Sequence, residues 1–390
     1  MYKYIQDSIK NNSRCVLAGL TKPQKKALNE IIRGLFTAGE PILRHIAQDK
    51  TKSAKKQAEK YSHHLGNIQI QEKVEALAMK EARKQIRKRT IIAYDLTDIA
   101  KESAKKIEKL SRVWDGSKRK TGIGFSLHGV GINGILTKFQ MHDGDKFMLN
   151  QIRKKIVTEI SEKLGKKGVW VVDRGNDDKQ FFKFLRQDLK VDFIARLKEN
   201  RQVVIKKTGA KIQVKYLQPG KYTVHLMKKN NDHVDLSSEY TLVISNHLKG
   251  KEPIRLLHGL GFKFSKNQIV NMYLQRWGVE NIFKRVKEKF NLERIRVLKW
   301  QKFVNLVALI QLAVLVSTIT FLKIQQSTNM LIIGVLLHYK KFMKLKTLGF
   351  NVDSFISFMK ISLKPLVFRL EKPPNQLNIF STQQLGKLTE

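Results

Sequence analysis

The sequence of 390 residues predicts an α/β protein, and three observations support this prediction. Between residues 89 and 198, short β-branched runs alternate with stretches of helical period. In residues 199–263 the apolar period changes to two, which is typical of strands. Residues 1–88 and 264–325 have helical spacing, and residues 326–390 are expected to form C-terminal helices and a tail. We therefore expect a core that contains a sheet, with a β-rich insertion and helices on either side.

Residues 1–88 are predicted to form a basic, helical region. The segment KPQKKALNEIIRGLFTAG has apolar residues three and four apart, and Gly39 is a plausible end for this helix. The segment PILRHIAQ follows as a second short helix after a tight turn. Such a pair is compatible with a helix-turn-helix module that binds DNA, and an ordinary helical subdomain explains it equally well.

Three strands are expected next, two of them in a hairpin. The β-branched run TIIAYDL is predicted to end at Asp95, and a polar, basic insert follows it. The runs GFSLHGV and GILTKFQ meet at the Asn133–Gly134 step, which favours a hairpin turn. Gly129, Gly131 and Gly134 also spell G-x-G-x-x-G. Because ILTKFQ alternates like a strand where that motif requires a helix, we reject a dinucleotide site.

The core continues with a helix, a strand, a helix and a strand. Phe147 to Leu164 is helical in pattern, and VWVVD is typical of a buried strand that ends at Asp173. The segment DDKQFFKFLRQDL is expected to be a helix that Asp177 and Asp178 cap. The run VDFIARL is the next strand, and the β-rich insertion follows it.

A further helical stretch starts at about Lys266 and carries charged side chains at regular spacing. In NMYLQRWGVENIFKRVKEKF, the residues Tyr273, Arg276, Glu280 and Lys287 have the spacing Y-x2-R-x3-E-x6-K. At about 100° per residue these positions fall within an arc of roughly 60° on one helix face. The arrangement suits a metal ion beside a polyphosphate backbone. The alternative is the polar face of an ordinary amphipathic helix.

The apolar stretch Phe303–Leu322 approaches the length of a membrane span. It contains Asn305, Gln311 and several hydroxyl side chains, and it follows a densely basic helix. We therefore expect a buried core helix that lies across the sheet, with no membrane as a partner.

The composition indicates a polyanionic partner. The chain has 75 Lys and Arg against 33 Asp and Glu, which gives a formal charge of +42 and a pI of about 10.2. An excess spread along the chain favours nucleic acid over an anionic membrane surface. The single cysteine, Cys15, and the lack of an apolar signal region at the N-terminus favour a reducing, cytoplasmic compartment.

Without the insertion, the expected order is βββαβαβ followed by α, which is the order of an RNase H-like fold. In that fold the first strand is central and lies beside the fourth, so Asp95 and Asp173 are expected to stand close together. The last helix would bring Glu280 to the pair. Three converging carboxylates require a cation, and hard oxygen ligands suit Mg²⁺ or Mn²⁺. Two such ions about 4 Å apart serve phosphodiester chemistry.

At these motifs the sequence resembles the DDE transposases of the IS4 group of bacterial insertion sequences. The resemblance rests on YDLTD around Asp95, VVDRGND around Asp173, and YLQRWGVENIFKRVK with its Y-R-E-K signature. A β-rich insertion between the second Asp and the Glu is also a feature of that group, and the match covers roughly residues 88–320. The resemblance implies that Asp95, Asp173 and Glu280 form a metal-binding catalytic triad.

The resemblance also implies contacts with double-stranded DNA. Tyr273, Arg276 and Lys287 match the positions that contact DNA phosphates near the cut, and Lys284 is a further candidate on the same helix. Trp277 follows Arg276, as it often does in the group. Its ring could pack in the core or stack near DNA, and we expect the core.

Two points stay open at this level. Asp98 is a further acidic residue beside the first motif and a weaker candidate for the site. Related hairpin-forming enzymes hold a flipped base with an aromatic residue, often Trp, from the insertion, and no Trp lies in this one. Tyr240, Phe262 or Phe264 could substitute, but nothing in the sequence selects one of them, so a hairpin intermediate is not predicted.

We interpret the sequence as that of a transposase. Residues 1–88 would bind the inverted repeats of its element, and the core would free a 3′-OH and join it to target DNA. A synaptic dimer is expected, with residues 326–390 as a candidate contact. The alternatives are a DNA-binding protein that has lost catalysis, an RNase H-like nuclease that cuts without joining, and a basic RNA-binding scaffold. The intact acidic positions argue against the first alternative.

Overall fold

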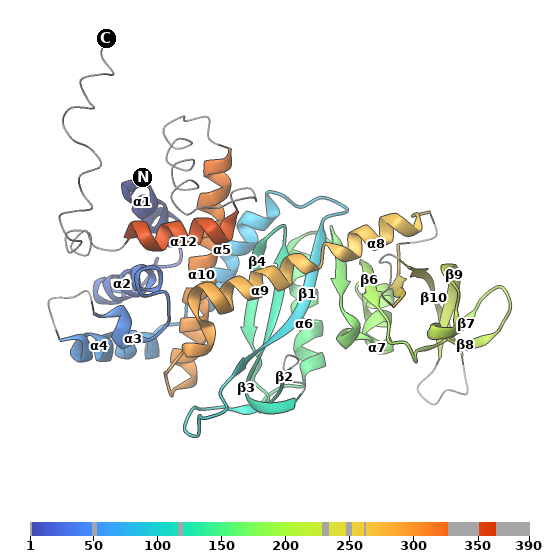
Figure 1. The fold of residues 1–390 in the computed structure, drawn as a ribbon, viewed down its shortest axis with the longest axis horizontal. Helices are drawn as coiled ribbons and strands as arrows, with labels where there is room; N and C mark the ends of the chain where they lie inside the picture. Colours follow the sequence, from blue (N-terminus) through green and yellow to red (C-terminus); the bar gives the residue numbers. More distant parts are fainter. Residues whose placement is uncertain are drawn as a thin grey trace, which may run out of the picture.

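A central sheet with helices on both faces dominates the computed structural model of the protein (Figure 1). The structure describes residues 2–48, 53–115, 120–227, 234–246, 252–260, 263–326 and 351–363. Figure 1 shows the N-terminal helices at one end of the molecule and the strands of the expected insertion at the other. The predicted mixed α/β class is confirmed. Most of the C-terminal segment predicted to hold helices and a tail, residues 327–350 and 364–390, lies outside the described residues.

The N-terminal part of the chain is helical. Its helices are α1 (Tyr2–Ser13), α2 (Lys22–Ala38), α3 (Leu43–Ile46), α4 (Ala54–Gly66) and α5 (Gln71–Arg83). Helix α2 begins with a capping box in which the Thr21 hydroxyl accepts from the Gln24 N–H and the Gln24 side chain accepts from the Thr21 N–H. It ends at Gly39, whose φ of 72° is left-handed, so the predicted end is confirmed. Helix α3 has about one turn and packs between α2 and α4.

The described strands form one sheet. They are β1 (Ile91–Ala100), β2 (Ser111–Asp115), β3 (Lys120–Ile132), β4 (Ile135–Met141), β5 (Val169–Val172), β6 (Asp192–Arg196), β7 (Gln202–Ile205), β8 (Lys211–Gln213), β9 (Gly220–Met227), β10 (Val234–Ser245) and β11 (Ile254–His258). Their order is β2-β3-β1-β5-β6-β11-β10-β9-β7-β8, and β4 pairs with β3. Strand β1 lies between β3, which is antiparallel to it, and β5, which is parallel to it. The predicted neighbourhood of the first and fourth strands is therefore confirmed.

The prediction that the first strand ends at Asp95 is wrong. Strand β1 pairs with β5 only from Ile91 to Tyr94, and it then continues along β3 as far as Ala100. The reason is that β1 keeps its antiparallel partners on β3 after the parallel pairing stops, with Asp95 opposite Gly129 and Ala100 opposite Gly124. Strand β3 also starts early, at Lys120 within the expected polar insert, and its first residues pair with β2. Asp95 thus lies in the middle of a strand, at the point where the parallel pairing stops.

Helices cover both faces of the sheet. The remaining helices are α6 (Leu149–Lys163), α7 (Lys179–Lys183), α8 (Lys266–Leu274), α9 (Trp277–Phe290), α10 (Trp300–Gln325) and α12 (Val352–Leu363). Helices α6 and α7 share one hydrophobic core with the sheet, and α8, α9 and α10 share the other. Helix α9 crosses in front of β1 and β3 in Figure 1.

The alternation of side chains along the strands decides which face each carboxylate occupies. Tyr94 on β1 belongs to the core on the α6 side, whereas Ala93 belongs to the core on the α9 side. Asp95 has the same parity as Ala93 and therefore faces α9. On the neighbouring strand Val171 belongs to the α9 side, so Asp173 has that parity as well. Both carboxylates are thus directed to the face that α9 covers.

The glycines of the rejected dinucleotide motif allow α9 to approach the sheet. A Cβ atom at Gly129 would lie 2.3 Å from the Phe283 ring, and one at Gly131 would lie 3.1 Å from Val279. Strand β4 follows directly after a turn at Asn133 and Gly134, both with positive φ, so the predicted hairpin is confirmed. The glycines therefore serve packing beneath the helix that carries Glu280.

The strands of the β-rich segment extend the core sheet. Strands β9, β10 and β11 form antiparallel pairs in sequence, and β11 pairs with β6 through three residues up to His258. Strand β11 was not identified from the sequence, because its run IRLLH is short and buried without alternation. The chain returns from this segment at Ser265, whose hydroxyl caps α8.

The predicted single helix from Lys266 is divided into α8 and α9. At the junction the Arg276 N–H donates to the Tyr273 carbonyl, and the Val279 N–H donates to the Arg276 carbonyl. These bonds have the three-residue spacing of a tighter turn than the α-helix. The tighter turn lies where the Arg276 side chain enters the protein toward β1. The prediction of one continuous helix is therefore wrong at Arg276, where α8 ends and α9 has not yet begun.

Helix α10 is long and apolar enough to cross a membrane, but 94% of its apolar stretch is buried inside the protein. It packs against β4 and against the N-terminal helices α1, α2, α4 and α5. Its polar side chains have protein partners, since Gln311 donates to the Leu136 carbonyl and Asn305 donates to the carbonyls of Leu65 and Ile68. The expected buried core helix is confirmed.

Candidate active site

The two aspartates emerge from adjacent parallel strands. Tyr94 on β1 pairs with Val172 on β5, and the next residues along the two strands are Asp95 and Asp173. Asp95 is largely buried, and the charge of Asp173 acts on it directly. The structure therefore brings together the first two residues of the predicted triad.

Arg276 links Asp95 to Glu280. Its Nη1 donates to Asp95 Oδ2 at 2.9 Å, and its Nη2 forms an ion pair with Glu280 Oε1 at 2.6 Å. Only 6% of Arg276 is exposed, whereas 47% of the Glu280 side chain is exposed. The sequence predicted the Arg276–Glu280 neighbourhood through their spacing of four on a helix. The contact with Asp95, 181 residues away, had no local signal.

The environment of Asp95 disfavours its charge. Burial and then the neighbouring charge of Asp173 raise the pKa of Asp95 to about 7, although Arg276 and the Leu96 N–H act in the opposite direction. The same cluster acts on Arg276, whose pKa is raised by Tyr273, Asp95 and Glu280 in spite of burial. One guanidinium thus pairs with two carboxylates while the charge of a third, Asp173, acts on Asp95, so negative charge remains in excess of the Arg276 charge.

Asp173 is held by the loop that follows it. Asn176 donates from its side chain to Asp173 Oδ1 at 2.6 Å. A Cβ atom at position 175, which is Gly175, would lie 3.2 and 3.3 Å from the two Asp173 carboxylate oxygens. The glycine therefore leaves room around both oxygens. Asn176 was not singled out in the sequence, although it lies within VVDRGND.

The residues expected as caps after Asp173 divide into two roles. Asp178 accepts from the N–H groups of Gln180 and Phe181, so its role as the cap of α7 is confirmed. Asp177 does not cap that helix. It accepts from the Lys198 N–H and from the Arg201 guanidinium, and it anchors the loop to the start of the β-rich segment.

Lys287 lies nearly two helix turns beyond Glu280 and contacts two carboxylates. Its Nζ is 3.5 Å from an oxygen of Asp98 and 3.5 Å from an oxygen of Glu293. Asp98 therefore lies beside the predicted DNA-contact residue Lys287 rather than among the ion pairs of Arg276. Lys284 is strongly exposed and is 3.9 Å from Glu288 on the same helix.

Tyr273 and Trp277 differ from their expected environments in opposite ways. Tyr273, expected at a DNA phosphate, is buried, and burial raises its pKa. The Arg276 guanidinium lies 5.6 Å from the centre of its ring. Trp277, expected in the core, is 49% exposed, so that prediction is wrong. Trp277 directly follows the tighter turn at Arg276, which a continuous helical pattern did not reveal.

The structure describes two of the three aromatic residues that were considered as holders of a flipped base. Tyr240 is buried in the core beside Phe193, and Phe264 is buried near Arg89 and Lys263. Phe262 lies outside the described residues. Two of the three candidates are therefore core residues.

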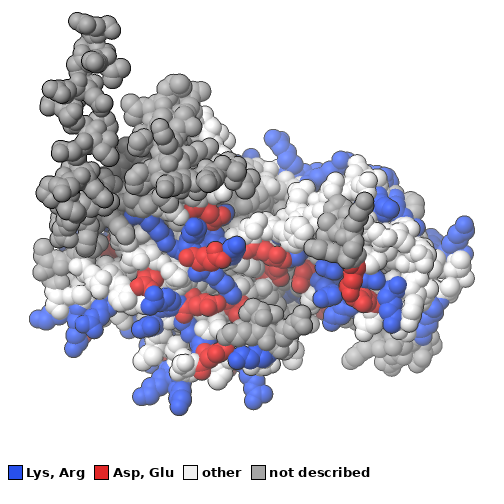
Figure 2. Space-filling model, viewed as in Figure 1, with Lys and Arg blue, Asp and Glu red and all other residues white. Residues whose placement is uncertain are grey.

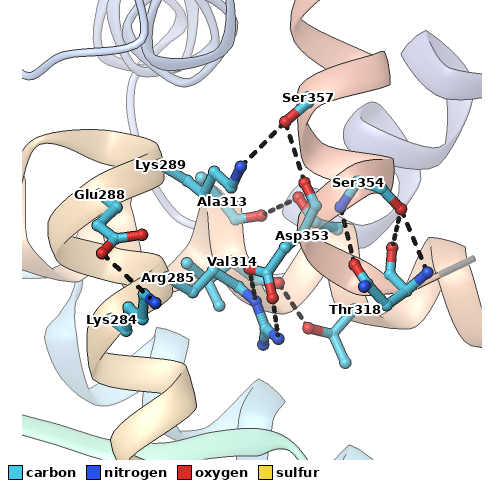
Figure 3. A network of polar contacts seen from close by, with 12 residues as sticks. Lys284, Arg285, Glu288, Lys289, Ala313, Val314, Thr318, Asp353, Ser354 and Ser357 are labelled. Atoms are coloured by element: carbon cyan, nitrogen blue, oxygen red, sulfur yellow. Dashed lines mark hydrogen bonds and ion pairs between the residues drawn. The ribbon is translucent and has the colours of Figure 1, made fainter. Parts of the chain in front are cut away.

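The half of α9 that follows Glu280 is fixed to the C-terminal helix α12. Figure 3 shows Arg285 directed at Asp353, with Nε–Oδ1 and Nη2–Oδ2 distances of 2.8 and 3.3 Å. One turn further, Lys289 donates to Ser357 at 3.1 Å. On the face seen in Figure 2, acidic side chains gather across the middle, where α9 crosses the sheet in Figure 1, and basic side chains surround them.

The donor set of the site fits a hard divalent cation. Asp95, Asp173 and Glu280 offer carboxylate oxygens in excess of the single positive charge on Arg276, and Gly175 leaves space at Asp173. Among the described residues, no group of three or more His, Cys, Asp or Glu side chains lies close enough together to form a metal site. The reason is visible in the ion pairs: Arg276 lies between Asp95 and Glu280.

Comparison with known proteins agrees with this geometry. A family model described as "Transposase DDE domain" matches residues 86–316, which is more than half of the chain. The matched segment contains β1, β5 and α9, and so all three acidic residues of the candidate site. A search of the curated proteins gives no match.

Proposed function

This chain belongs to the transposase DDE-domain family, and from this premise we propose that it cleaves DNA at the ends of its own element and joins the freed 3′-OH ends to target DNA. The observation that best supports the proposal is the approach of Asp95, Asp173 and Glu280 from β1, β5 and α9 to one charged cluster. The high positive charge of the chain supports a DNA partner.

We further propose that the enzyme is of the IS4 type, with an RNase H-like core. The strand order β3-β1-β5-β6 with α9 on one face supports the core assignment. The spacing of Tyr273, Arg276, Glu280 and Lys287, together with the strands between Asp173 and Glu280, supports the IS4 type. In this proposal residues 89–198 and 264–325 are the catalytic core.

The other parts of the chain receive roles on the same basis. Residues 1–88 are proposed to bind the terminal inverted repeats, because they are basic and helical. Residues 199–263 are the β-rich insertion, which extends the sheet beyond β6. Residues 326–390 are proposed to take part in a synaptic dimer.

Asp95, Asp173 and Glu280 are proposed as ligands for Mg²⁺ or Mn²⁺, with two ions as the expected number. When bound, the metal would supply an activated nucleophile and stabilise the leaving oxygen of the phosphodiester. Burial of Asp95 in a cluster with excess negative charge supports a cation-binding role.

Arg276, Lys287 and Lys284 are proposed to bind DNA phosphates. Arg276 presents a planar fork that suits a phosphate, and Lys287 and Lys284 act as point charges on the same helix. Tyr273 lies beneath Arg276, and we propose that its ring holds the guanidinium in position for the DNA.

The proposal is tested by strand cleavage and strand joining. The protein is incubated with Mg²⁺ and a duplex that carries the repeats flanking its own reading frame, beside a Glu280→Gln variant. A new 3′-OH that then joins to target DNA, absent with the variant, is the expected result. Binding of the ends without cutting would favour a DNA-binding protein without catalysis, and cutting without joining would favour a nuclease.

A further inference from the structure

The polar groups of the candidate site are already paired with one another. Asp95 uses Oδ2 for Arg276 and Oδ1 for the Leu96 N–H, and Glu280 is paired with the other arm of Arg276. A similar pairing holds Lys287, which lies 3.5 Å from Asp98. The signature cations of α9 are thus bound to carboxylates of the protein itself.

This pairing conflicts with the two tasks that the site must perform. The proposed function requires Asp95 and Glu280 to hold a metal ion and Arg276 to hold a DNA phosphate. The guanidinium and a divalent ion compete for the same carboxylate oxygens, because Arg276 contacts both residues at 2.9 and 2.6 Å. One of the two cations must leave before the other can bind both carboxylates.

The geometry gives Arg276 a way to leave. Glu280 lies in the first turn of α9 with nearly half of its side chain exposed, so it can change partners without disturbing the core. Arg276 lies at the tight turn between α8 and α9, next to the exposed Trp277. The second half of α9 is fixed by the contact between Arg285 and Asp353 and does not need to move.

We propose that Arg276 is an internal cation that occupies the place of the metal in the DNA-free protein, so that metal and DNA bind cooperatively. A DNA phosphate at the site draws the guanidinium away from Asp95 and Glu280, and the released carboxylates then bind the divalent ion. This inference rests on the proposed function, since it assigns the metal and the phosphate to the same residues. Metal loading then depends on the presence of the DNA.

The energetic basis is an exchange of partners. In the free protein one guanidinium partly neutralises Asp95 and Glu280, and a metal ion must displace it. With DNA present, the guanidinium gains a phosphate and the carboxylates gain a metal, so each ligand removes a competitor of the other. Reciprocity requires that the metal strengthen DNA binding by the same factor by which DNA strengthens metal binding.

The first test measures Mn²⁺ affinity of the full-length wild-type protein by electron paramagnetic resonance, with and without DNA. A duplex with a pre-cut element end is used, so that no strand is cleaved during the titration. We expect roughly tenfold tighter Mn²⁺ binding in the presence of the duplex. Equal affinity with and without the duplex would overturn the inference, and this outcome does not depend on any variant.

The second test removes the internal cation. Without DNA, Arg276→Gln is expected to bind Mn²⁺ roughly tenfold more tightly than the wild type, because no guanidinium competes for the carboxylates. Arg294→Gln is the matched control: it removes a half-exposed arginine that pairs with Glu40, outside the site, and is expected to bind Mn²⁺ as the wild type does. Circular dichroism verifies that both variants are folded.

The outcomes separate the inference from the proposed function. Unchanged or weaker Mn²⁺ binding by folded Arg276→Gln would overturn the role of Arg276, while the cleavage and joining assay would still decide whether the protein is a transposase. If neither protein bound Mn²⁺ with or without DNA, the assignment of the metal site to Asp95 and Glu280 would fail, and with it this inference.

Discussion

Two clusters in this protein place one cation between two carboxylates, and they differ in what surrounds them. The first is Lys138 with Glu75 and Glu159 at 2.7 and 3.1 Å, and the second is Arg276 with Asp95 and Glu280 at 2.9 and 2.6 Å. In both clusters the cation is more than nine-tenths buried, and one carboxylate of each pair is more exposed than the other. The ion-pair geometry alone does not distinguish them.

The charge balance does distinguish them. Glu159 also pairs with Lys163, so the Lys138 cluster has two cations for two carboxylates and links α5, β4 and α6. In the Arg276 cluster the charge of Asp173 also acts on Asp95, so one ion-paired cation serves two carboxylates beside a third, and Arg153 acts on that third carboxylate from a distance. The charges of the first cluster are balanced, and the cluster serves to connect elements of the fold. The second retains negative charge that a further cation can neutralise, as a site that binds a divalent ion requires.

The largest difference between the clusters is expected in catalysis. Asp95→Asn removes one proposed metal ligand and is expected to lower strand cleavage by roughly a thousandfold or more. The variant should stay folded, because an amide relieves the repulsion between Asp95 and Asp173 and can still accept from the Leu96 N–H. Cleavage of an end duplex and a thermal melt are measured in parallel. Asp188→Asn, an exposed position, is the control, and cleavage by Asp95→Asn at the control rate would contradict the assignment.

The Lys138 cluster is expected to control stability instead. Lys138→Met leaves Glu75 buried without its cation, so the free energy of unfolding should fall by about 3–5 kcal/mol. Lys163→Met removes a more exposed partner of Glu159 and should cost less than about 1 kcal/mol. Urea unfolding measures both variants. Equal losses would show that burial at Lys138 does not matter and would remove the contrast with the Arg276 cluster.

A smaller effect is expected at the contact that holds α9. Arg285→Gln removes a guanidinium that is 10% exposed and pairs through two nitrogens with Asp353 on α12. Because 41% of the Asp353 side chain is exposed, water screens the pair, and a loss of about 1–2 kcal/mol in the free energy of unfolding is expected. Lys284→Gln, one position earlier on the same helix, pairs with Glu288 in solvent and should be close to neutral. Thermal melts that fail to separate the two variants would argue against α12 as the support of α9.

The comparison also shows which features of the site were predictable from sequence. The β-branched runs before Asp95 and Asp173 predicted parallel neighbours, and β1 and β5 are paired in this way. The helical spacing of Arg276 and Glu280 predicted that these side chains meet. Such features depend on local periodicity and on one rule of strand order, both of which the sequence contains.

Other features depend on long-range packing and were missed for that reason. The Arg276–Asp95 contact joins residues 181 positions apart. The tight turn at Arg276 and the exposed Trp277 lie next to that contact, and helix propensity did not indicate either of them. The extension of β1 beyond Asp95 depends on antiparallel pairing with β3, which continues as far as Ala100 after the parallel pairing with β5 has stopped. In each case a partner outside the local window decided the conformation.

The last expected effect depends on pH and concerns His128, which lies near Lys138 and bonds to Tyr94, the residue before Asp95. Its Nδ1 is 2.7 Å from the Tyr94 hydroxyl, and its Nε2 is 3.3 Å from His142. Burial, together with the nearby His142, Arg153 and Lys138, lowers the pKa of His128 to about 3. A proton on His128 would therefore add charge to a buried region that already contains two cations.

The sign of the pH dependence follows from this lowered pKa. The folded protein keeps His128 neutral down to about pH 3, whereas the unfolded chain takes up a proton near pH 6.5, so the unfolded state binds more protons between these values. The free energy of unfolding should thus fall as the pH is lowered through this window, by about 2 kcal/mol between pH 6.5 and 5. His128→Gln keeps a hydrogen-bond partner for Tyr94 but cannot titrate. Its free energy of unfolding should therefore fall by about 2 kcal/mol less than that of the wild type between the two pH values. Urea unfolding of both proteins at the two pH values measures the difference. Equal losses of unfolding free energy in the wild type and in His128→Gln would mean that His128 is protonated in the folded protein. A protonated His128 would be a third cation beside Lys138 and Arg153. That result would weaken the claim that the charges of the Lys138 cluster are balanced.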